Sequence, residues 1–352
     1  MEKLKRMAPS TRSSFITYGM VIVAYAVMEA LLSGGLLKSS LKGLLVPICA
    51  YVVMAVSLNL TVGIMGELSL GHAGFMSVGA FTAVIAAAAL ESTVTSGPVR
   101  LAVSMAIGGV AAGLVSLIVV VPVLRLQGDY LAIVTLAFGE IIKNIINCVY
   151  VGLDGEGFHF GMKDAASLGL AADGKMLLQG PMGAVGIQKL SSFTAGFLLI
   201  LLTLAVALNF IHSRAGRAVM ALRDNRIAAE SVGISPSRYK MMAFVTSAVL
   251  AGLAGGLYAM NFSSILAKKF DFNTSILILV FVVLGGMGNI RGSVIAAAAL
   301  TVLPELLRDF SDYRMLVYAI VLILVMLFTN NPACKTVFAR FKLGSPAKKE
   351  AV

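Results

Sequence analysis

Charged residues are scarce in this sequence. Only 13% of its 352 residues are Asp, Glu, Lys or Arg, and 59% are hydrophobic, whereas about a quarter of a soluble globular domain is charged. Uncharged windows such as 101–124 and 241–267 exceed the roughly 18 apolar residues that a membrane-spanning helix requires. The shortage of charge excludes an ordinary soluble domain and predicts a polytopic membrane protein, built as an all-α bundle of transmembrane helices.

Residues that bind metals or nucleotides are also few. The three cysteines and three histidines are scattered, without the close spacing that holds a metal ion. The phosphate-binding patterns GxxxxGKS and GxxxxGKT are absent, and no nucleophile–base pair marks an intramembrane enzyme. We therefore expect no catalytic residue, no metal and no cofactor in this chain.

The apolar residues form about ten stretches long enough to examine as membrane spans. They cover approximately residues 15–35, 43–66, 68–90, 101–124, 130–150, 190–211, 241–267, 272–290, 292–307 and 315–329. The parts at 63–90 and 272–290 can be re-entrant or broken, so we expect about eight to ten spans. Glu29 interrupts the first apolar run, which favours a retained span over a cleaved signal peptide.

The basic residues indicate the orientation of these spans. Both ends of the chain are basic, and the positive-inside rule places them in the cytoplasm. The chain then divides into a cytoplasmic tail at 1–14, a transmembrane domain at 15–330 and a basic cytoplasmic tail at 331–352. The loop at 212–240 falls inside, and the more acidic loop at 151–189 falls outside. The net charge of +11 indicates attraction to membrane lipid and not to nucleic acid.

Two segments are unusually rich in glycine. They lie at 63–79 and 284–293, and they resemble each other, with MGELSLG at 65–71 and MGNIRG at 287–292. Paired glycine-broken segments in two halves of a transporter indicate an inverted repeat around a central pathway. Close helix packing or tight turns would explain the same glycines.

The segment SRAGRAVMALRDNRIAAESVGIS at 213–235 is too charged to cross lipid. Ser213 is a plausible N-cap, Gly233 a plausible C-cap, and Pro236 stops any continuation, so we expect a cytoplasmic helix. Such a helix could lie on anionic headgroups. Its apolar residues are mostly small, as at Ala229, and this favours docking in a groove of a cytoplasmic partner.

Four blocks of the sequence resemble a known family. GRAVMALRDNRIAAESVGIS at 216–235 resembles the cytoplasmic coupling loop, or EAA loop, of ABC importer permeases. RLQGDYLAIVTLAFGEIIKNIINC at 125–148, LNLTVGIMGELSLGHAGFMSVGAF at 58–81 and VVLGGMGNIRGSVIAAA at 282–298 are similar to blocks of the branched-chain amino acid permeases. The resemblance covers most of 41–330 and is strongest to the M-type subunit. An extra piece at 152–179 departs from the family pattern.

The resemblance implies a function and a set of partners. The chain would be the permease subunit of an ABC importer in the bacterial cytoplasmic (inner or plasma) membrane, moving leucine, isoleucine and valine by alternating access. ATP and Mg²⁺ would be bound by two separate cytoplasmic ATPase subunits. A related H-type permease or a second copy of this chain would complete the pore. An extracellular or periplasmic substrate-binding protein would deliver the substrate.

The candidate site residues fall into two sets. Positions that match the ATPase-coupling loop of the family are Arg217, Arg223, Asp224, Asn225, Ala229, Glu230 and Gly233. The second set is the candidate substrate pathway, made up of polar or glycine residues inside predicted spans. Polar groups are costly within a membrane, so we take those found there as candidates for function. They are Asn59, Gly66, Ser69, Gly71, His72, Thr135, Glu140, Asn144, Gly286, Gly288 and Asn289.

Other interpretations of these residues stay open. Glu140 and Lys143 are three apart on one helix face, where they would neutralise each other either as a structural ion pair or within a pathway. With Asp129 they could instead form the relay of an ion-coupled secondary transporter, which would leave the 213–235 helix unexplained. Within the ABC class, urea, short amides or other amino acids are alternative substrates.

Overall fold

The computed structural model describes residues 9–35, 39–123, 126, 128–154, 157–164, 168–169, 174–308, 313, 316–317, 319–320 and 322–323. The chain divides into two compact units, residues 1–301 and 302–352. The architecture below is that of the first unit, with the last residues of helix α12 running on into the second. The predicted span at 315–329 lies mostly, and the predicted tail at 331–352 entirely, outside the described residues.

Among the described residues, seven helices are long and apolar enough to cross a membrane. They are α2 (Pro9–Ser33), α3 (Ser39–Asn59) with its continuation η1 (Leu60–Met65), α4 (His72–Ala89), α5 (Gly97–Val123), α6 (Asp129–Cys148), α7 (Phe193–His212) and α10 (Pro236–Ala259). The predicted polytopic helical class is confirmed.

The remaining helices are shorter. They are α8 (Arg214–Asp224), α9 (Arg226–Ser231), α11 (Phe272–Gly285), α12 (Ile290–Leu306) and the 3₁₀ turns η3 (Gly180–Met182) and η4 (Ala267–Phe270). The stretch predicted at 272–290 thus forms a helix of only 14 residues, whereas about 20 are needed to cross the bilayer. This agrees with the expectation that the stretch is broken or re-entrant.

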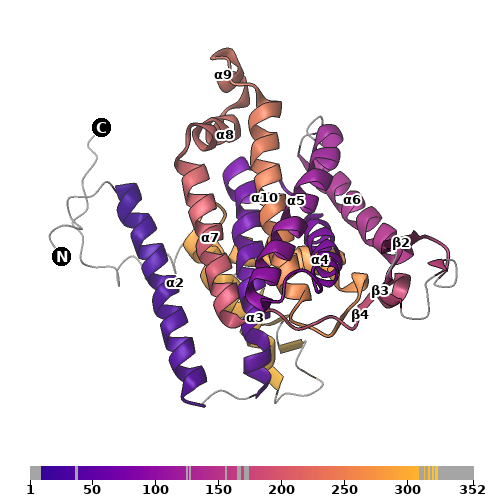
Figure 1. Cartoon of the computed structure of the whole chain (residues 1–352). Helices are drawn as coiled ribbons and strands as arrows, with labels where there is room; N and C mark the ends of the chain where they lie inside the picture. The colour runs from indigo at the N-terminus through magenta and orange to yellow at the C-terminus, as the bar shows by residue number, and fades with distance from the viewer. Residues whose placement is uncertain are drawn as a thin grey trace, which may run out of the picture. The chain divides into compact units, whose positions relative to one another are not determined.

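Helices α4, α5 and α10 form the centre of the first unit, and α3 packs against α10 and α7 (Figure 1). Each central helix contributes a glycine where their backbones meet, namely Gly79, Gly108 and Gly252. A Cβ atom on Gly252 would lie 2.9 Å from the carbonyl oxygen of Gly108, and one on Gly79 would collide with the backbone of Gly252. Such small residues let helices approach closely where lipid supplies no hydrophobic driving force between them.

The first glycine-rich segment breaks a membrane helix. Helix α3 passes at Leu60 into the π-helix η1, which ends at Gly66 in the left-handed conformation (φ 76°, ψ 17°). Helix α4 begins only at His72, so the helix starts later than the hydrophobic stretch at 68–90. Glycine adopts this backbone without the steric cost that a Cβ atom imposes.

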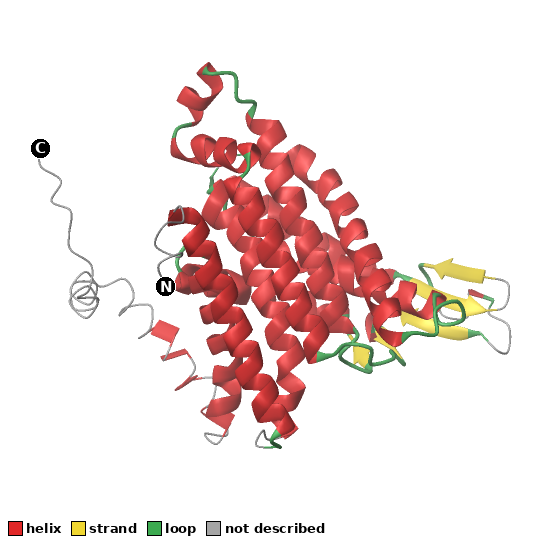
Figure 2. Ribbon diagram, turned by 60° about the vertical axis from the view of Figure 1, so that its left-hand side comes forward, coloured by secondary structure: helices red, strands yellow, loops and turns green. Residues whose placement is uncertain are grey.

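The predicted outer loop and the segment after α10 together form a small sheet that the sequence did not predict. Its strands are β1 (Tyr150–Asp154), β2 (Gly157–Gly161), β3 (Lys175–Gln179), β4 (Ala184–Val185) and β5 (Ser264–Ile265). All neighbours are antiparallel, in the order β2-β1-β3-β4-β5. Val151 of β1 stands opposite Phe160 of β2 and Leu178 of β3. The sheet follows the end of α6, away from α8 and α9 (Figure 2).

Candidate functional site

The basic segment forms two helices, not one. The Ser213 hydroxyl accepts a hydrogen bond from the amide of Gly216, so the predicted N-cap is confirmed. Helix α8 ends at Asp224, because Asn225 is extended (φ −154°, ψ 103°) and its side chain caps α9 by accepting from the amide of Ala228. The turn after α9 contains Gly233 at φ 86°, which agrees with its predicted place at the helix end. The expectation of one continuous helix over 213–233 was wrong.

The apolar residues of this segment divide between two surfaces. Val219 and Leu222 of α8 are at most 4% exposed and hold that helix against η1, α7 and α10, whereas Ala229, 5% exposed, is buried in α9, which packs mainly on α8. Ile227 and Val232 are 82% and 74% exposed. Sequence reasoning assigned docking to the small residues, but the free apolar surface belongs to these two larger ones. Their spacing, just before and just after the alanines of α9, was the available signal.

Five of the six charged residues of the segment make hydrogen bonds within the chain. Arg226 Nε donates to Glu230 Oε1 at 2.7 Å along α9, and Arg217 donates to the carbonyl of His212 at 3.1 Å. Arg223 donates from Nε and Nη2 to Asp224 Oδ1 at 3.0 and 2.9 Å. Its third nitrogen, Nη1, donates to the carbonyl of Gly63 in η1 at 3.0 Å.

A second ion pair holds the loop that follows η1. Lys240, in the first turns of α10, bonds Glu67, and both side chains are only 12% exposed. Arg223 therefore holds η1 from α8, and Lys240 holds the loop at 66–71 from α10. Charge pairs with so little exposure are weakly screened by salt, so this end of the loop is firmly anchored.

The two glycine-rich segments meet through Asn59. Its Oδ1 accepts from the amide of Gly288 at 2.8 Å, and its Nδ2 donates to Ser293 Oγ at 3.0 Å. A Cβ atom on Gly63 would collide with the backbone of Gly288. The left-handed Gly286 and Gly288 (φ 89° and 81°) shape the turn between α11 and α12. The structure thus brings together the two segments that the sequence paired, while their role in a pathway stays a prediction.

Asn289 belongs to the same turn. Its amide donates to the carbonyl of Gly286 at 2.9 Å, and its carbonyl accepts from Ser293 Oγ at 3.3 Å. Its polar groups therefore stabilise the turn, as the interpretation of these glycines as a tight turn requires.

The N-termini of α4 and α11 also meet. The amide of Ala73 donates to Ser275 Oγ at 3.2 Å, and His72 Nε2 lies 2.8 Å from Ser57 Oγ in α3. Thr135 of α6 accepts from the amide of Leu70 at 3.1 Å. Among the described residues, the buried Ser69 hydroxyl has no hydrogen-bond partner. Several predicted pathway residues therefore gather where two helix N-termini converge, and such ends attract negative charge.

A closed cleft lies beside this junction. Its walls come from the loop before α4, from α6, and from the start of α11: Leu70, Gly74, Leu136, Gly139, Glu140, Phe270, Asp271, Phe272 and Ser275. The cleft has no room for a water-sized sphere. Gly71 and Gly139 keep α6 close, since a Cβ atom on Gly139 would lie 3.1 Å from Gly71 Cα. The region is packed shut in this conformation.

Helix α6 carries two further candidates. Glu140 pairs with Lys143, as the sequence predicted, and Lys143 is 17% exposed. Asn144 is exposed one helical turn after Glu140, next to Ile141 and Ile145, which are 50% and 52% exposed. Polar side chains at membrane depth usually face protein or water rather than lipid. Asn144 therefore marks a face of α6 that another surface is expected to cover.

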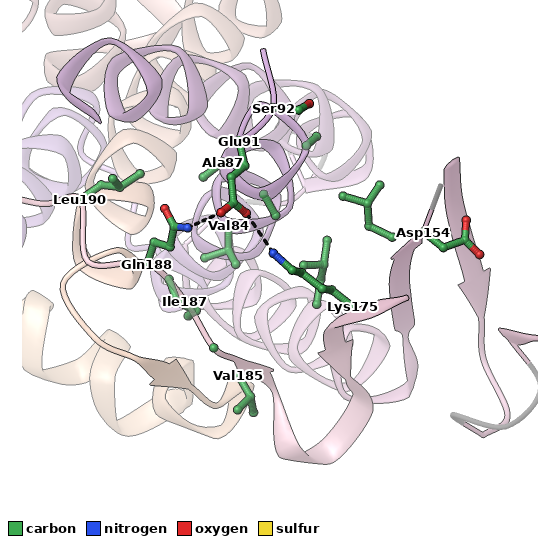
Figure 3. A pocket seen from close by; sticks show the side chains of 15 residues that line it. Val84, Ala87, Glu91, Ser92, Asp154, Lys175, Val185, Ile187, Gln188 and Leu190 are labelled. Atoms are coloured by element: carbon green, nitrogen blue, oxygen red, sulfur yellow. Dashed lines mark hydrogen bonds and ion pairs between the residues drawn. The ribbon is translucent and has the colours of Figure 1, made fainter. Parts of the chain in front are cut away.

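Sequence reasoning missed a pocket on the side of the sheet, lined mostly by apolar residues and crossed by a polar network. The pocket has a volume of about 510 Å³ and lies between the end of α4 and strands β1, β3 and β4 (Figure 3). Gln188 Nε2 donates to Glu91 Oε1 at 2.5 Å, Lys175 Nζ lies 3.6 Å from Glu91 Oε2, and the buried Arg100 donates to Gln188. A buried arginine at the start of an apolar span was the signal for this network.

Comparisons with known proteins agree on one family. The family model described as "Branched-chain amino acid transport system / permease component" matches residues 40–326. The chain is 34% identical over 308 residues to the high-affinity branched-chain amino acid transport system permease protein LivM of Salmonella typhimurium, covering 85% of this chain and 71% of that protein. The corresponding LivM of Escherichia coli K12 is 33% identical over 315 residues, with the same coverage.

A paralogous permease is similar over a shorter range. The permease protein LivH of Salmonella typhimurium is 31% identical over 126 residues, which is 35% of this chain and 41% of that protein. No solved structure matches the chain significantly.

Proposed function

The chain belongs to the family of branched-chain amino acid transport system permease components, and on that premise we propose that it is the membrane subunit of an ABC importer for leucine, isoleucine and valine. ATP hydrolysis takes place in two separate cytoplasmic ATPase subunits, which bind the ATP and Mg²⁺. The chain itself performs no chemistry and translocates its substrate by alternating access. It lies in the bacterial cytoplasmic membrane, with both termini in the cytoplasm.

One observation carries this proposal. An exposed, basic pair of short helices, α8 and α9, stands at one end of the bundle and is tied directly to a glycine-rich break in a membrane helix. Exposed Ile227 and Val232 supply the apolar contact with the ATPase, and the Arg226–Glu230 pair rims it. A secondary transporter works without an ATPase subunit and would therefore not need this exposed helix pair.

We place the substrate route at the junction of α4 and α11. A zwitterionic amino acid needs donors for its carboxylate and a negative group for its ammonium. The converging helix N-termini supply the first, and Glu140 and Asp271 in the cleft wall supply the second. Leu70, Leu136 and Phe272 line the same cleft and suit an aliphatic side chain. Because the cleft is closed, the route opens only when α6 or α11 moves.

Besides the ATPase subunits, two further protein partners complete the importer. A related permease of the H-type, or a second copy of this chain, covers the exposed face of α6 around Asn144. A substrate-binding protein docks on the sheet, where Phe160, Met162 and Met182 are 69%, 72% and 65% exposed. The extra piece at 152–179 builds β2 and β3 of this surface, so it shapes the docking site.

The proposal is tested by reconstitution in proteoliposomes. The chain is combined with its H-type permease, ATPase subunits and binding protein, and uptake of labelled leucine is followed with ATP on the ATPase side. We expect ATP-dependent uptake that unlabelled isoleucine and valine suppress and that urea does not. The matched control contains an ATPase whose phosphate-loop lysine is replaced by alanine, which abolishes hydrolysis. Uptake driven by a proton gradient without ATP would refute the ABC mechanism, and suppression by urea alone would refute the substrate.

A further inference from the structure

Arg223 points into the membrane domain, although it belongs to the segment predicted to meet the ATPase. Its guanidinium lies between two acceptors, Asp224 on its own helix and the carbonyl of Gly63 in η1. The side chain is 37% exposed, so part of it is covered by the bundle. Three of its five N–H groups donate within the chain, and the Nε–Nη2 edge that would grip a partner's carboxylate is already taken by Asp224.

The Gly63 carbonyl needs such a donor. Gly63 is the third-last residue of η1, and the last carbonyls of a helix have no intrahelical amide to accept from. The amides of Gly66 and Glu67 both bond Thr61 instead. A cationic donor at a helix C-terminus also interacts favourably with the helix dipole. Arg223 therefore caps the broken helix from a different element.

The approach of Arg223 depends on a second glycine. A Cβ atom on Gly66 would lie 2.5 Å from Arg223 Cγ and 3.1 Å from its Cδ. The left-handed turn at Gly66 thus makes room for the arginine stem as well as ending η1. Gly66 thus allows both the left-handed backbone of the break and the close approach of the Arg223 side chain. The conformation of the break therefore depends on the position of α8.

The contact continues from η1 to the second glycine-rich turn. Gly63 packs against Gly288 with no room for a side chain, and Asn59, one turn earlier, bonds both the Gly288 amide and Ser293. These contacts are tightly packed. A displacement of α8 would therefore also move the α3–η1 break and the α11–α12 turn. π-Helical turns occur often at functional sites, and this one leads into the first glycine-rich segment and contacts the second.

We propose that Arg223 is a positioning residue that transmits movement of α8 to both glycine-rich turns, and does not bind the ATPase. This rests on the proposed function, since it assigns the part of the importer that converts ATPase closure into opening of the membrane route. Lys240 of α10, which lies outside the segment at 213–235, anchors the loop at 66–71 that follows η1. The end of η1 and the loop after it are thus held by α8 through Arg223 and by α10 through Lys240.

The test is a comparison of Arg223→Met with Arg214→Met in the reconstituted importer. Arg214 is exposed in the first turn of the same helix, so its replacement removes an equal charge without touching η1. For Arg223→Met we expect normal co-purification of the ATPase, ATP hydrolysis within about twofold of the unmodified importer, and leucine uptake about tenfold lower. Arg214→Met should keep uptake and hydrolysis coupled.

Other outcomes separate this inference from the proposed function. Loss of the ATPase from the Arg223→Met complex would show that Arg223 contacts the partner, and unchanged leucine transported per ATP would show that it transmits nothing. Either result overturns the inference alone. Absence of ATP-driven leucine uptake by the unmodified importer would overturn the proposed function itself.

A conservative variant keeps the test decisive if Arg223→Met does not fold. Arg223→Lys retains the charge, but a single ammonium cannot reproduce the fork that reaches both Asp224 and Gly63. We expect about threefold less leucine transported per ATP with this variant. Coupling equal to that of the unmodified importer would contradict a role for the double contact.

Discussion

Buried polar side chains in this bundle differ in whether they have partners. Ser57 donates to the carbonyl of Met54 at 2.9 Å, so its oxygen accepts from His72 Nε2, and the Ser57 carbonyl accepts from Ser247 Oγ at 2.5 Å. Ser104, equally buried, has no partner for its hydroxyl among the described residues. At membrane depth an unpaired hydroxyl donor has no water to hydrogen-bond, so its burial costs free energy. The Ser57–His72 contact therefore contributes stability that the Ser104 hydroxyl does not.

Replacing these two serines by alanine should have different effects. Ser57→Ala leaves the His72 Nε2–H group buried without an acceptor, which we expect to cost about 1–3 kcal/mol. Ser104→Ala removes an unsatisfied hydroxyl and should be neutral or slightly stabilising. The thermal midpoint of unfolding in detergent measures both. Equal shifts for the two variants would contradict the assignment of the Ser57–His72 hydrogen bond.

At the scale of elements, the sequence predicts helix ends better than helix breaks. Ser213 and Gly233 act as predicted, because capping depends on the residue itself and its nearest amides. The break at Asn225 was missed, since it lies within a helix-forming run and shows only where its side chain caps α9. The π-helix depends on contacts with Arg223 and Gly288, which are distant in sequence. The sheet was missed because strands of two to five residues give little periodic signal.

The Asn225 cap makes α9 sensitive to one substitution. Asn225→Ala removes the acceptor for the Ala228 amide, and loss of such a cap typically costs about 1 kcal/mol. A helix of six residues has few internal hydrogen bonds to compensate. We expect faster hydrogen exchange of the amides from 228 to 231, while α8 stays protected.

The matched control for this prediction is Asn225→Asp, which keeps a capping oxygen. Its exchange in α9 should remain close to that of the unmodified chain. If Asn225→Ala left exchange in α9 unchanged, the cap would not be what separates α8 from α9.

At the scale of the whole molecule, the charge distribution predicts an orientation that the bundle makes testable. The basic helices α8 and α9 stand at one end of the first unit. The sheet begins after the C-terminal end of α6, at the other end of this unit (Figure 1). Among the candidate site residues, the glycine-rich pairing followed from sequence because the two segments resemble each other. The inward direction of Arg223 depends on how α8 packs on the bundle, and the burial of Ala229 depends on how α9 packs on α8, which no local pattern encodes.

Single cysteines at these two ends should label from opposite sides of the membrane. In a chain lacking its native cysteines, Met182→Cys beside the sheet should react with a membrane-impermeant maleimide in intact spheroplasts, because Met182 is 65% exposed. Ser231→Cys, at the exposed end of α9, should react only after lysis, since basic loops are retained in the cytoplasm. Val53→Cys is a control for access, because Val53 is fully buried and should stay unlabelled in both conditions. Labelling of Ser231→Cys in intact spheroplasts would reverse the orientation and remove α8 and α9 from the reach of any cytoplasmic ATPase.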